Sequence, residues 1–138
     1  MNSGYSGTPL AKKLGIKEGH ALCLVNSSDE IEAWLSPLPD AVSITRRVPA
    51  GPTIDVIVAF FTREADAVKR LPALERALAP AGGLWLSWPK KASGVATDLT
   101  EQTFRDLLLP AGRLVDNKVC AISDIWSGLR FVVRKDRR

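Results

Sequence analysis

Leu78-Ala79-Pro80-Ala81-Gly82-Gly83-Leu84-Trp85-Leu86-Ser87-Trp88 is the stretch that decides the fold class of this chain. Its first residues end a segment whose apolar residues recur at helical spacing. Its proline and two glycines are typical of a tight turn. The last five residues are largely apolar, as in a strand covered on both faces. A helix end, a tight turn and a buried strand are the helix-to-strand half of a βαβ unit, so we predict an α/β fold.

The residues before this stretch predict the same alternation of helices and strands. Apolar runs predict strands at 20–25, 42–48 and 55–61, and helical spacing predicts helices at 10–15, 29–35 and 62–79. We expect Thr8 to cap the first helix, with Pro9 in its first turn, Ser27 or Ser28 to cap the second, and Thr62 to cap the third. Pro72 predicts a kink or a restart in the third helix. The segment 49–52 is too short for a helix, so a loop must cross the end of the sheet there.

The residues after this stretch complete the sheet. Asp98 and Glu101 resemble an acidic capping box before a helix at 99–109. Strands are expected at 114–123 and 129–135, and the short connection between them predicts an antiparallel hairpin. We therefore predict an open, mostly parallel, Rossmann-like α/β sheet of six strands, with an antiparallel C-terminal hairpin and helices on both faces.

Length and charge limit the class of protein. A chain of 138 residues is one domain by its size, which we place at residues 1–133, with a basic tail at 134–138. The net charge is +4, and this tail alone contributes +3, because Asp136 offsets one of its four basic groups. The rest of the chain is almost neutral and shows no basic face with interleaved aromatic residues, so nucleic acid is not an expected partner. The oligomeric state stays open.

Several classes of site and location are disfavoured by what the chain lacks. No apolar run is long enough to span a membrane, and the first residues do not form a signal peptide, so we expect a cytoplasmic protein. Cys23 and Cys120 each lie in an apolar run, without a CxxC pair or a His/Cys cluster, so we expect neither a metal site nor a disulfide.

The succession of a helix end, the segment 78–83, a strand, a helix and a closing hairpin resembles the second half of a class I methyltransferase domain. That family implies an open parallel sheet with one reversed strand near the edge, which gives the strand order 2-1-3-4-6-5 here, and binding of S-adenosylmethionine. In that order Cys23 and Cys120 lie four strands, about 19 Å, apart, whereas bridged Cα atoms are at most about 7 Å apart. This chain resembles a shortened version that lacks one helix-strand-helix unit in the middle. Its whole length is also similar to a family of small uncharacterised bacterial proteins, a domain of unknown function, in Gly4-Tyr5-Ser6-Gly7-Thr8-Pro9-Leu10-Ala11-Lys12-Lys13-Leu14-Gly15, Trp88-Pro89-Lys90-Lys91-Ala92-Ser93-Gly94 and Lys118-Val119-Cys120-Ala121.

The chain departs from the methyltransferase pattern where the cofactor would bind. That family has a glycine-rich turn after strand one, but here the turn is Asn26-Ser27-Ser28-Asp29-Glu30. The family also has an acid at the end of strand two for the ribose hydroxyls, whereas this strand ends near Arg46-Arg47. We therefore expect no S-adenosylmethionine, and the missing glycines also argue against NAD or FAD. The expected cofactor is none, because a likeness in fold does not by itself imply function.

Ligands of open α/β sheets bind outside the carboxyl ends of the parallel strands. That rule selects Asn26 to Asp29, Arg46-Arg47, Thr62-Arg63 and Trp88 to Asp98. The last segment is the richest, with Lys90, Lys91, Ser93 and Thr97 near a helix start, and Lys12 or Lys13 could complete an anion site from the N-terminal helix. The alternative is a solvated loop in which Asp98 caps the helix.

No catalytic set is visible in this sequence. His20 is the one histidine and is expected at the wrong end of its strand, and no Ser/His/Asp or Cys/His set can be assembled. Trp88 and Trp126 adjoin loops and could wall a pocket or an interface as well as fill the core. We expect a methyltransferase-like domain that binds a small anionic ligand or a protein partner. The alternatives are an enzyme with an unrecognised variant of the cofactor site and a nucleic-acid-associated protein that uses its basic tail.

Overall fold

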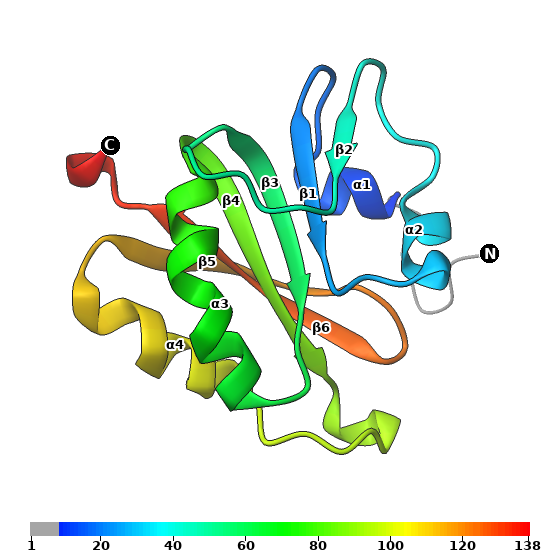
Figure 1. Ribbon diagram of the computed structural model, residues 1–138. Coiled ribbons are helices and arrows are strands. Elements are labelled where there is room, and N and C mark those ends of the chain that lie inside the picture. The colour runs from blue at the N-terminus through cyan, green and yellow to red at the C-terminus, as the bar shows by residue number, and fades with distance from the viewer. Residues whose placement is uncertain (1–8) are drawn as a thin grey trace.

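Six strands form one twisted, mixed sheet in the order β2-β1-β3-β4-β6-β5, as predicted (Figure 1). The protein is described by a computed structural model of residues 9–138. Neighbouring strands among β1 to β4 pair parallel, and β6 alone is reversed, because it runs antiparallel to both β4 and β5. The strands are β1 (Ala21–Val25), β2 (Ser43–Thr45), β3 (Ile54–Phe60), β4 (Leu78–Pro89), β5 (Leu114–Ala121) and β6 (Trp126–Val133).

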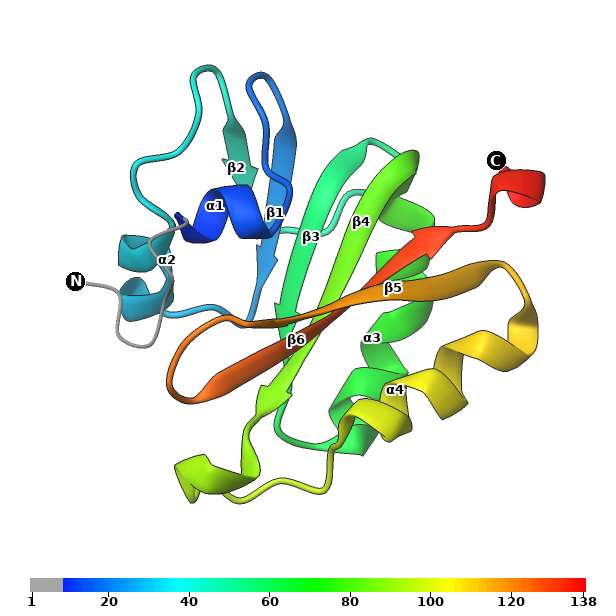
Figure 2. The ribbon, with the colours of Figure 1, turned by 180° about the vertical axis from the view of Figure 1, so that it is seen from behind.

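Helices cover both faces of the sheet, which confirms the predicted architecture. Helices α1 and α2 lie on one face, and α3 and α4 lie on the other (Figures 1 and 2). The helices are α1 (Leu10–Lys13), α2 (Asp29–Leu35), α3 (Glu64–Ala77) and α4 (Glu101–Leu108), with short 3-10 turns at η1 (Lys91–Ser93), η2 (Leu109–Ala111) and η3 (Lys135–Arg137). In the described part of the chain, no helix is long and apolar enough to cross a membrane.

Two apolar clusters, one on each face, hold these layers together. The first combines Leu71 and Leu74 of α3 with Phe104 of α4, and the second combines Leu10 of α1 with Ile31 of α2. Strand β3 contributes alternate residues to both clusters, so it is apolar along almost its whole length. Such burial on both faces is what a continuous apolar run predicts.

The stretch that decides the fold class forms a bulge rather than a free turn. Helix α3 ends at Ala77, and β4 begins at once with Leu78, so the strand starts earlier than we predicted. Leu78 pairs with Ile54 and Gly83 with Val56, so the segment 79–82 is accommodated opposite a single residue of β3. A Cβ on Gly82 would lie 2.7 Å from the carbonyl oxygen of Asp55, which explains why this position needs glycine.

The ends of two other strands also differ from the prediction. Strand β2 stops at Thr45 rather than residue 48, because the Thr45 hydroxyl bonds to the backbone of Arg47 and turns the chain. The hairpin between β5 and β6 turns earlier than expected. The amides of Ile122 and Ser123 both donate to the Trp126 carbonyl, so β6 begins at Trp126 rather than at residue 129.

The helix caps confirm one assignment and correct two. Ser28 caps α2 by accepting a hydrogen bond from the Ile31 amide at 3.2 Å. Helix α4 is capped by Thr100, in a capping box with Thr103, and not by Asp98. Asp98 instead accepts from the Glu64 amide at 2.7 Å and so caps α3, where we had expected Thr62. The local pattern could not reveal a cap that is 34 residues distant in sequence.

Helix α3 continues through Pro72 without a restart. Proline has no amide hydrogen, so the carbonyl of Val68, four residues earlier, loses its usual helical donor. Both residues lie on the exposed side of the helix, where water can bond to that carbonyl. Pro9 precedes α1 rather than opening it, and Gly15 ends that turn with φ 79° as expected. Thr8 lies outside the described residues.

The cysteines are free, which confirms the prediction. Cys23 is buried in the cluster beneath α3 and α4, and Cys120 is buried in the cluster beneath α1 and α2. Burial raises the pKa of each thiol above its usual value. Residues 9–138 also bring together no group of three or more His, Cys, Asp or Glu side chains that could hold a metal ion.

Candidate functional site

The carboxyl ends of β1 and β3 form the switch point of the sheet. The chain leaves β1 through α2 to reach β2 on one side, and it leaves β3 through α3 to reach β4 on the other. In Figure 1 the arrows of β1, β3 and β4 all point toward the lower part of the view, where these ends lie. Adjacent strands whose connections diverge in this way leave a crevice that open α/β proteins use for ligands.

Asn26 holds the two strand ends together. It follows β1 directly and has φ 59°, a left-handed conformation that asparagine tolerates better than most residues. Its side-chain nitrogen donates to the carbonyl of Phe60, the last residue of β3, at 3.0 Å. Asn26 therefore makes the sharp exit from β1 that a glycine would otherwise provide.

A cavity of about 550 Å³ opens at this switch point. Phe60 and Trp126 form its aromatic wall and contact each other edge to face, with ring centroids 5.1 Å apart. Lys69 and Arg70 of α3 bring two positive charges to its lining, against the single carboxylate of Asp66. We call this the switch-point cavity; it is lined by Asn26, Phe60, Phe61, Thr62, Asp66, Lys69, Arg70 and Trp126.

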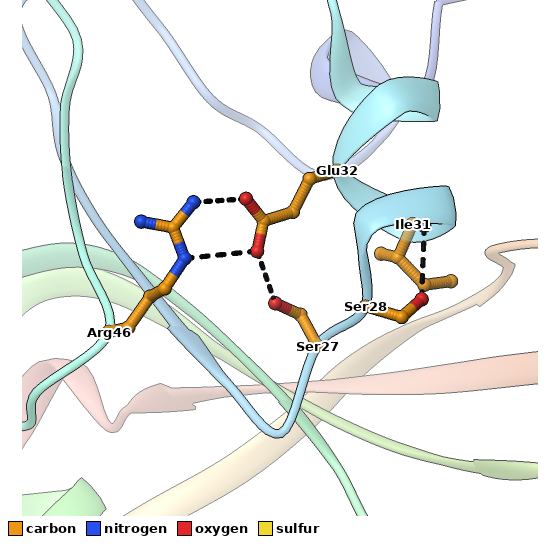
Figure 3. Close-up of polar contacts among 5 residues, drawn as sticks. All are labelled: Ser27, Ser28, Ile31, Glu32 and Arg46. Carbon is orange, nitrogen blue, oxygen red and sulfur yellow. Dashed lines mark hydrogen bonds and ion pairs between the residues drawn. The ribbon is translucent and has the colours of Figure 1, made fainter.

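An ion pair closes the neighbouring end of β2 (Figure 3). Arg46, just after β2, pairs with Glu32 of α2 through two contacts, and its Nε lies 3.1 Å from Glu32 Oε2. The Ser27 hydroxyl donates to the same oxygen at 2.7 Å. We call this group of Ser27, Glu32 and Arg46 the Glu32 clamp. It ties the β1–α2 turn to the end of β2.

The Glu32 clamp should make stability depend on pH. Hydrogen bonds from Arg46 and then Ser27 lower the pKa of Glu32 below 4.5. The clamp therefore stabilises the fold above that pH, and this contribution is lost as the pH falls through the lowered value. We expect Glu32→Gln to lower the free energy of unfolding at neutral pH and to match the wild type in strong acid, as measured by urea unfolding across pH. The control is Glu30→Gln, which removes the same charge from the same helical turn. A deficit that is the same at every pH would contradict the role of the clamp.

Loop 90–98 borders the switch-point cavity. The Lys90 amide donates to the carbonyl of Ile125, beside Trp126, at 2.6 Å. The Thr97 hydroxyl donates to the carbonyl of Thr62 at 2.6 Å, and both Thr62 and Trp126 line the cavity. The loop that follows β4 is therefore fixed to two parts of the cavity rim.

The predicted site residues of this loop have separate roles. The Ser93 hydroxyl donates to the Lys90 carbonyl at 2.6 Å and accepts from the Val95 amide, so it shapes the η1 turn. Lys91 and Thr97 line a smaller hollow of about 190 Å³ with Trp88, Pro89, Leu99 and Thr100. Lys91 is exposed and Lys90 is half-buried.

The structure places the two predicted lysines of α1 elsewhere. Lys12 is exposed, and the Lys13 ammonium donates to the carbonyl of Ala121 at the end of β5, 3.5 Å away. Neither residue lines the switch-point cavity.

Sequence reasoning located part of this cavity and missed its cations. Asn26, Thr62 and Trp126 stand at positions that the strand-end rule and the loop boundaries had marked. Lys69 and Arg70 were missed, because they come nine and ten residues after the end of β3, inside helix α3. Their spacing of three and four residues from Asp66 is a usable signal, since it puts all three on one face of α3.

No protein-family model matches this chain. No curated protein matches it either. Among solved structures, it is similar to a SAM-dependent methyltransferase from Aquifex aeolicus, with TM-score 0.63 and 16% identity over 91% of this chain and 88% of the other. A putative type 11 methyltransferase from Sulfolobus solfataricus gives TM-score 0.62 and 13% identity over 91% and 90% of the two chains. The N-methyltransferase NodS from Bradyrhizobium japonicum gives TM-score 0.57 and 12% identity over 95% of this chain and 100% of the other.

These likenesses confirm the fold that the sequence resemblance implied. The chain has a methyltransferase-like, Rossmann-type α/β fold in a short form of 138 residues. At such low identities the likeness concerns the fold alone, and activity must be argued from the site.

Proposed function

We propose that this chain binds a small anionic molecule with a flat or aromatic part in the switch-point cavity. The observation that carries the proposal is the composition of one cavity at the ligand-binding end of an α/β sheet. It combines two cations, an aromatic wall and one fixed amide. Concave sites that are largely apolar and carry a few convergent polar groups are the usual form of a small-molecule site.

The charges favour an anion over a cation or a neutral ligand. Lys69 and Arg70 outnumber Asp66 in the lining. Arg70 is half-buried, and its positive charge lowers the pKa of the buried Cys23 thiol, against the larger effect of burial. A planar guanidinium suits a carboxylate or phosphate group, which it can hold through two parallel hydrogen bonds.

Loop 90–98 would add charge at the rim. Pro89 of β4 pairs with Trp126 of β6, and Lys90 comes directly after Pro89. Lys90 therefore lies next to the aromatic wall. The hydrogen bond from Thr97 to Thr62 keeps the loop against the cavity. In this proposal Lys90 and Lys91 attract the ligand, while Ser93 and Thr97 hold the loop in shape.

A ligand screen tests this function. Native mass spectrometry of the purified protein looks for a co-purified anion, and thermal shifts are then measured with nucleotides, acyl phosphates and sugar phosphates. A ligand at 100 times its dissociation constant should stabilise the fold by about 2.7 kcal/mol. An anion that raises Tm in the wild type but not in Arg70→Gln supports the proposal. Arg76→Gln, on the same helix but outside this cavity, is the matched control. If no anion of the panel stabilises the protein, or if all act equally on Arg70→Gln, the proposal fails.

An enzyme with a variant cofactor site is the second candidate, favoured by the methyltransferase fold. The resemblance implies S-adenosylmethionine, with a glycine-rich turn after β1 and a ribose-binding acid after β2. Asn26 and the clamped Ser27 occupy the first place, and Arg46 occupies the second. A guanidinium cannot accept hydrogen bonds from ribose hydroxyls, and Glu32 is already engaged. These residues do not fit that cofactor.

We therefore expect S-adenosylmethionine to bind without useful affinity. Isothermal titration calorimetry should show no saturable heat in the micromolar range. The anion with the largest thermal shift serves as the positive control on the same protein sample. Micromolar binding of S-adenosylmethionine would contradict this prediction and favour the enzyme.

A further inference from the structure

The face of the sheet that carries α1 bears a group of cations on β5 and β6, away from the switch-point cavity. Arg130 of β6 stands in register between Lys118 of β5 and Trp85 of β4. Residues directly opposite in an antiparallel pair share a face. Trp85 donates from its indole nitrogen to the carbonyl of Leu14, just after α1, so that face is the one beneath α1 (Figure 2).

The Arg130 side chain lies in the space above Gly83 of β4. A Cβ on Gly83 would lie 2.5 Å from Arg130 Nε and 2.9 Å from its Cζ, so the guanidinium occupies the space that any side chain at position 83 would need. Arg130 is half-buried there. Because Gly83 has no side chain, the guanidinium has room to lie against the sheet.

No ion pair balances that charge within the described part of the chain. Arg130 makes no ion pair with any of residues 9–138, and residues 1–8 contain no Asp or Glu. Arg138 comes close to the same strand, because its Nε donates to the carbonyl of Val133, three positions after Arg130 on β6, at 2.9 Å. Burial, and then the positive charge of Arg138, lower the pKa of Arg130. Lys118, directly opposite, donates to the carbonyl of Lys13 rather than to an acid. Like charges opposite each other across strands are unfavourable.

Two other arginines show the contrast. Arg46 is paired with Glu32, and Arg105 of α4 is paired with Glu101 and with Asp116 of β5. Asp116 is two positions before Lys118 on the same strand, but its carboxylate is engaged by α4 on the opposite face. The acid that could have balanced Arg130 is therefore turned away from it.

We propose that Arg130, with Lys118 and Arg138, binds a phosphate group on this face of the sheet. The group would be inorganic phosphate or a phosphate monoester. A guanidinium is planar, and two of its N–H groups can donate to two oxygens of the same phosphate. The two flanking cations supply the remaining charge for a dianion. This site is separate from the switch-point cavity and does not depend on the function proposed for it.

The test follows the Arg130 Nε–Hε signal by NMR during a titration with inorganic phosphate. The signal is assigned by its loss in Arg130→Gln. We expect a saturable shift. The affinity for phosphate should fall by about two- to fivefold in Lys118→Gln, because the contact that is lost is exposed and screened by solvent and salt. Lys118 is exposed, so this variant does not put the fold at risk. Arg137→Gln carries the same change of charge in the same tail as Arg138 and should bind phosphate as the wild type does.

Three outcomes would overturn the proposal. Chloride at equal ionic strength could shift the signal as much as phosphate does, which would indicate screening alone. Lys118→Gln and Arg137→Gln could lose equal affinity, which would indicate a general charge effect. The shift could also vanish in Arg70→Gln, which would place the phosphate in the switch-point cavity. A saturable shift that survives Arg70→Gln supports a distinct site.

Discussion

Replacing Trp85 with alanine is expected to lower the free energy of unfolding by about 3–5 kcal/mol, the range for a fully buried aromatic side chain. Trp85 is 0% exposed and lies at the centre of β4. Its indole nitrogen donates to the Leu14 carbonyl at 3.0 Å, so it joins the sheet to the end of α1. A Cβ at Gly128 would lie 3.1 Å from its Cε3 atom, so the ring also fills the space above that glycine. The loss removes packing and a buried hydrogen bond together.

Urea unfolding followed by circular dichroism measures this effect. Trp85→Phe separates the two contributions, because it keeps much of the apolar volume and loses the hydrogen bond. We expect it to cost about 1–3 kcal/mol, since the Leu14 carbonyl is left without its donor. Trp34→Ala is the comparison, because Trp34 is only partly buried at the edge of the same cluster. A loss below about 1 kcal/mol for Trp85→Ala would contradict the role given to this residue.

The strands could be predicted from the sequence because their signals are local and strong, and the order of the strands followed from the resemblance to the methyltransferase fold. The runs that form β1 and β3 are apolar along their length, since both faces of these strands are buried. Ser28 was identifiable as a cap because its acceptor and the amide it bonds are three residues apart. The reversed β6 followed from a connection too short for a crossover.

The errors arose where a local pattern competes with a distant contact. Ala79 to Gly82 has the composition of a turn, but the pairing of Leu78 with Ile54 extends β4 through it as a bulge. Asp98 and Glu101 match a capping box, but Thr100 performs that role, and Asp98 bonds to Glu64. Both outcomes depend on contacts between segments that no short sequence pattern records.

The candidate site was predicted less well than the fold for the same reason. The strand-end rule marked loop 90–98, where charge is dense along the sequence. The cations of the switch-point cavity come instead from the middle of α3, and they reach the strand ends because α3 packs across them. From the sequence, Asn26 could be placed only where the family has a glycine. Its hydrogen bond to Phe60 depends on the pairing of β1 with β3, which no local pattern records.

The combined change of Lys69 and Arg70 to glutamine is expected to weaken binding in the switch-point cavity by about a hundredfold or more. Each charge-assisted hydrogen bond is worth about 1.5–3 kcal/mol, and a loss of about 3 kcal/mol corresponds to slightly more than a hundredfold in the dissociation constant. Lys69 is exposed and Arg70 half-buried, so the fold should survive the change. The measurement is calorimetry with the anion that gives the largest thermal shift in the wild type.

Two further variants divide this effect between the cavity and its rim. Lys90→Ala with Lys91→Ala removes two cations from the loop, and we expect a loss of about tenfold or less, because exposed charges are screened by solvent and salt. Added salt should then reduce the affinity of the wild type more than that of the loop variant. Arg76→Gln should bind as the wild type does, since Arg76 lies on α3 outside the cavity.

If the loop variant loses more affinity than the Lys69→Gln/Arg70→Gln variant, the ligand binds over loop 90–98. Unchanged binding in a folded Lys69→Gln/Arg70→Gln protein would remove the switch-point cavity as the anion site.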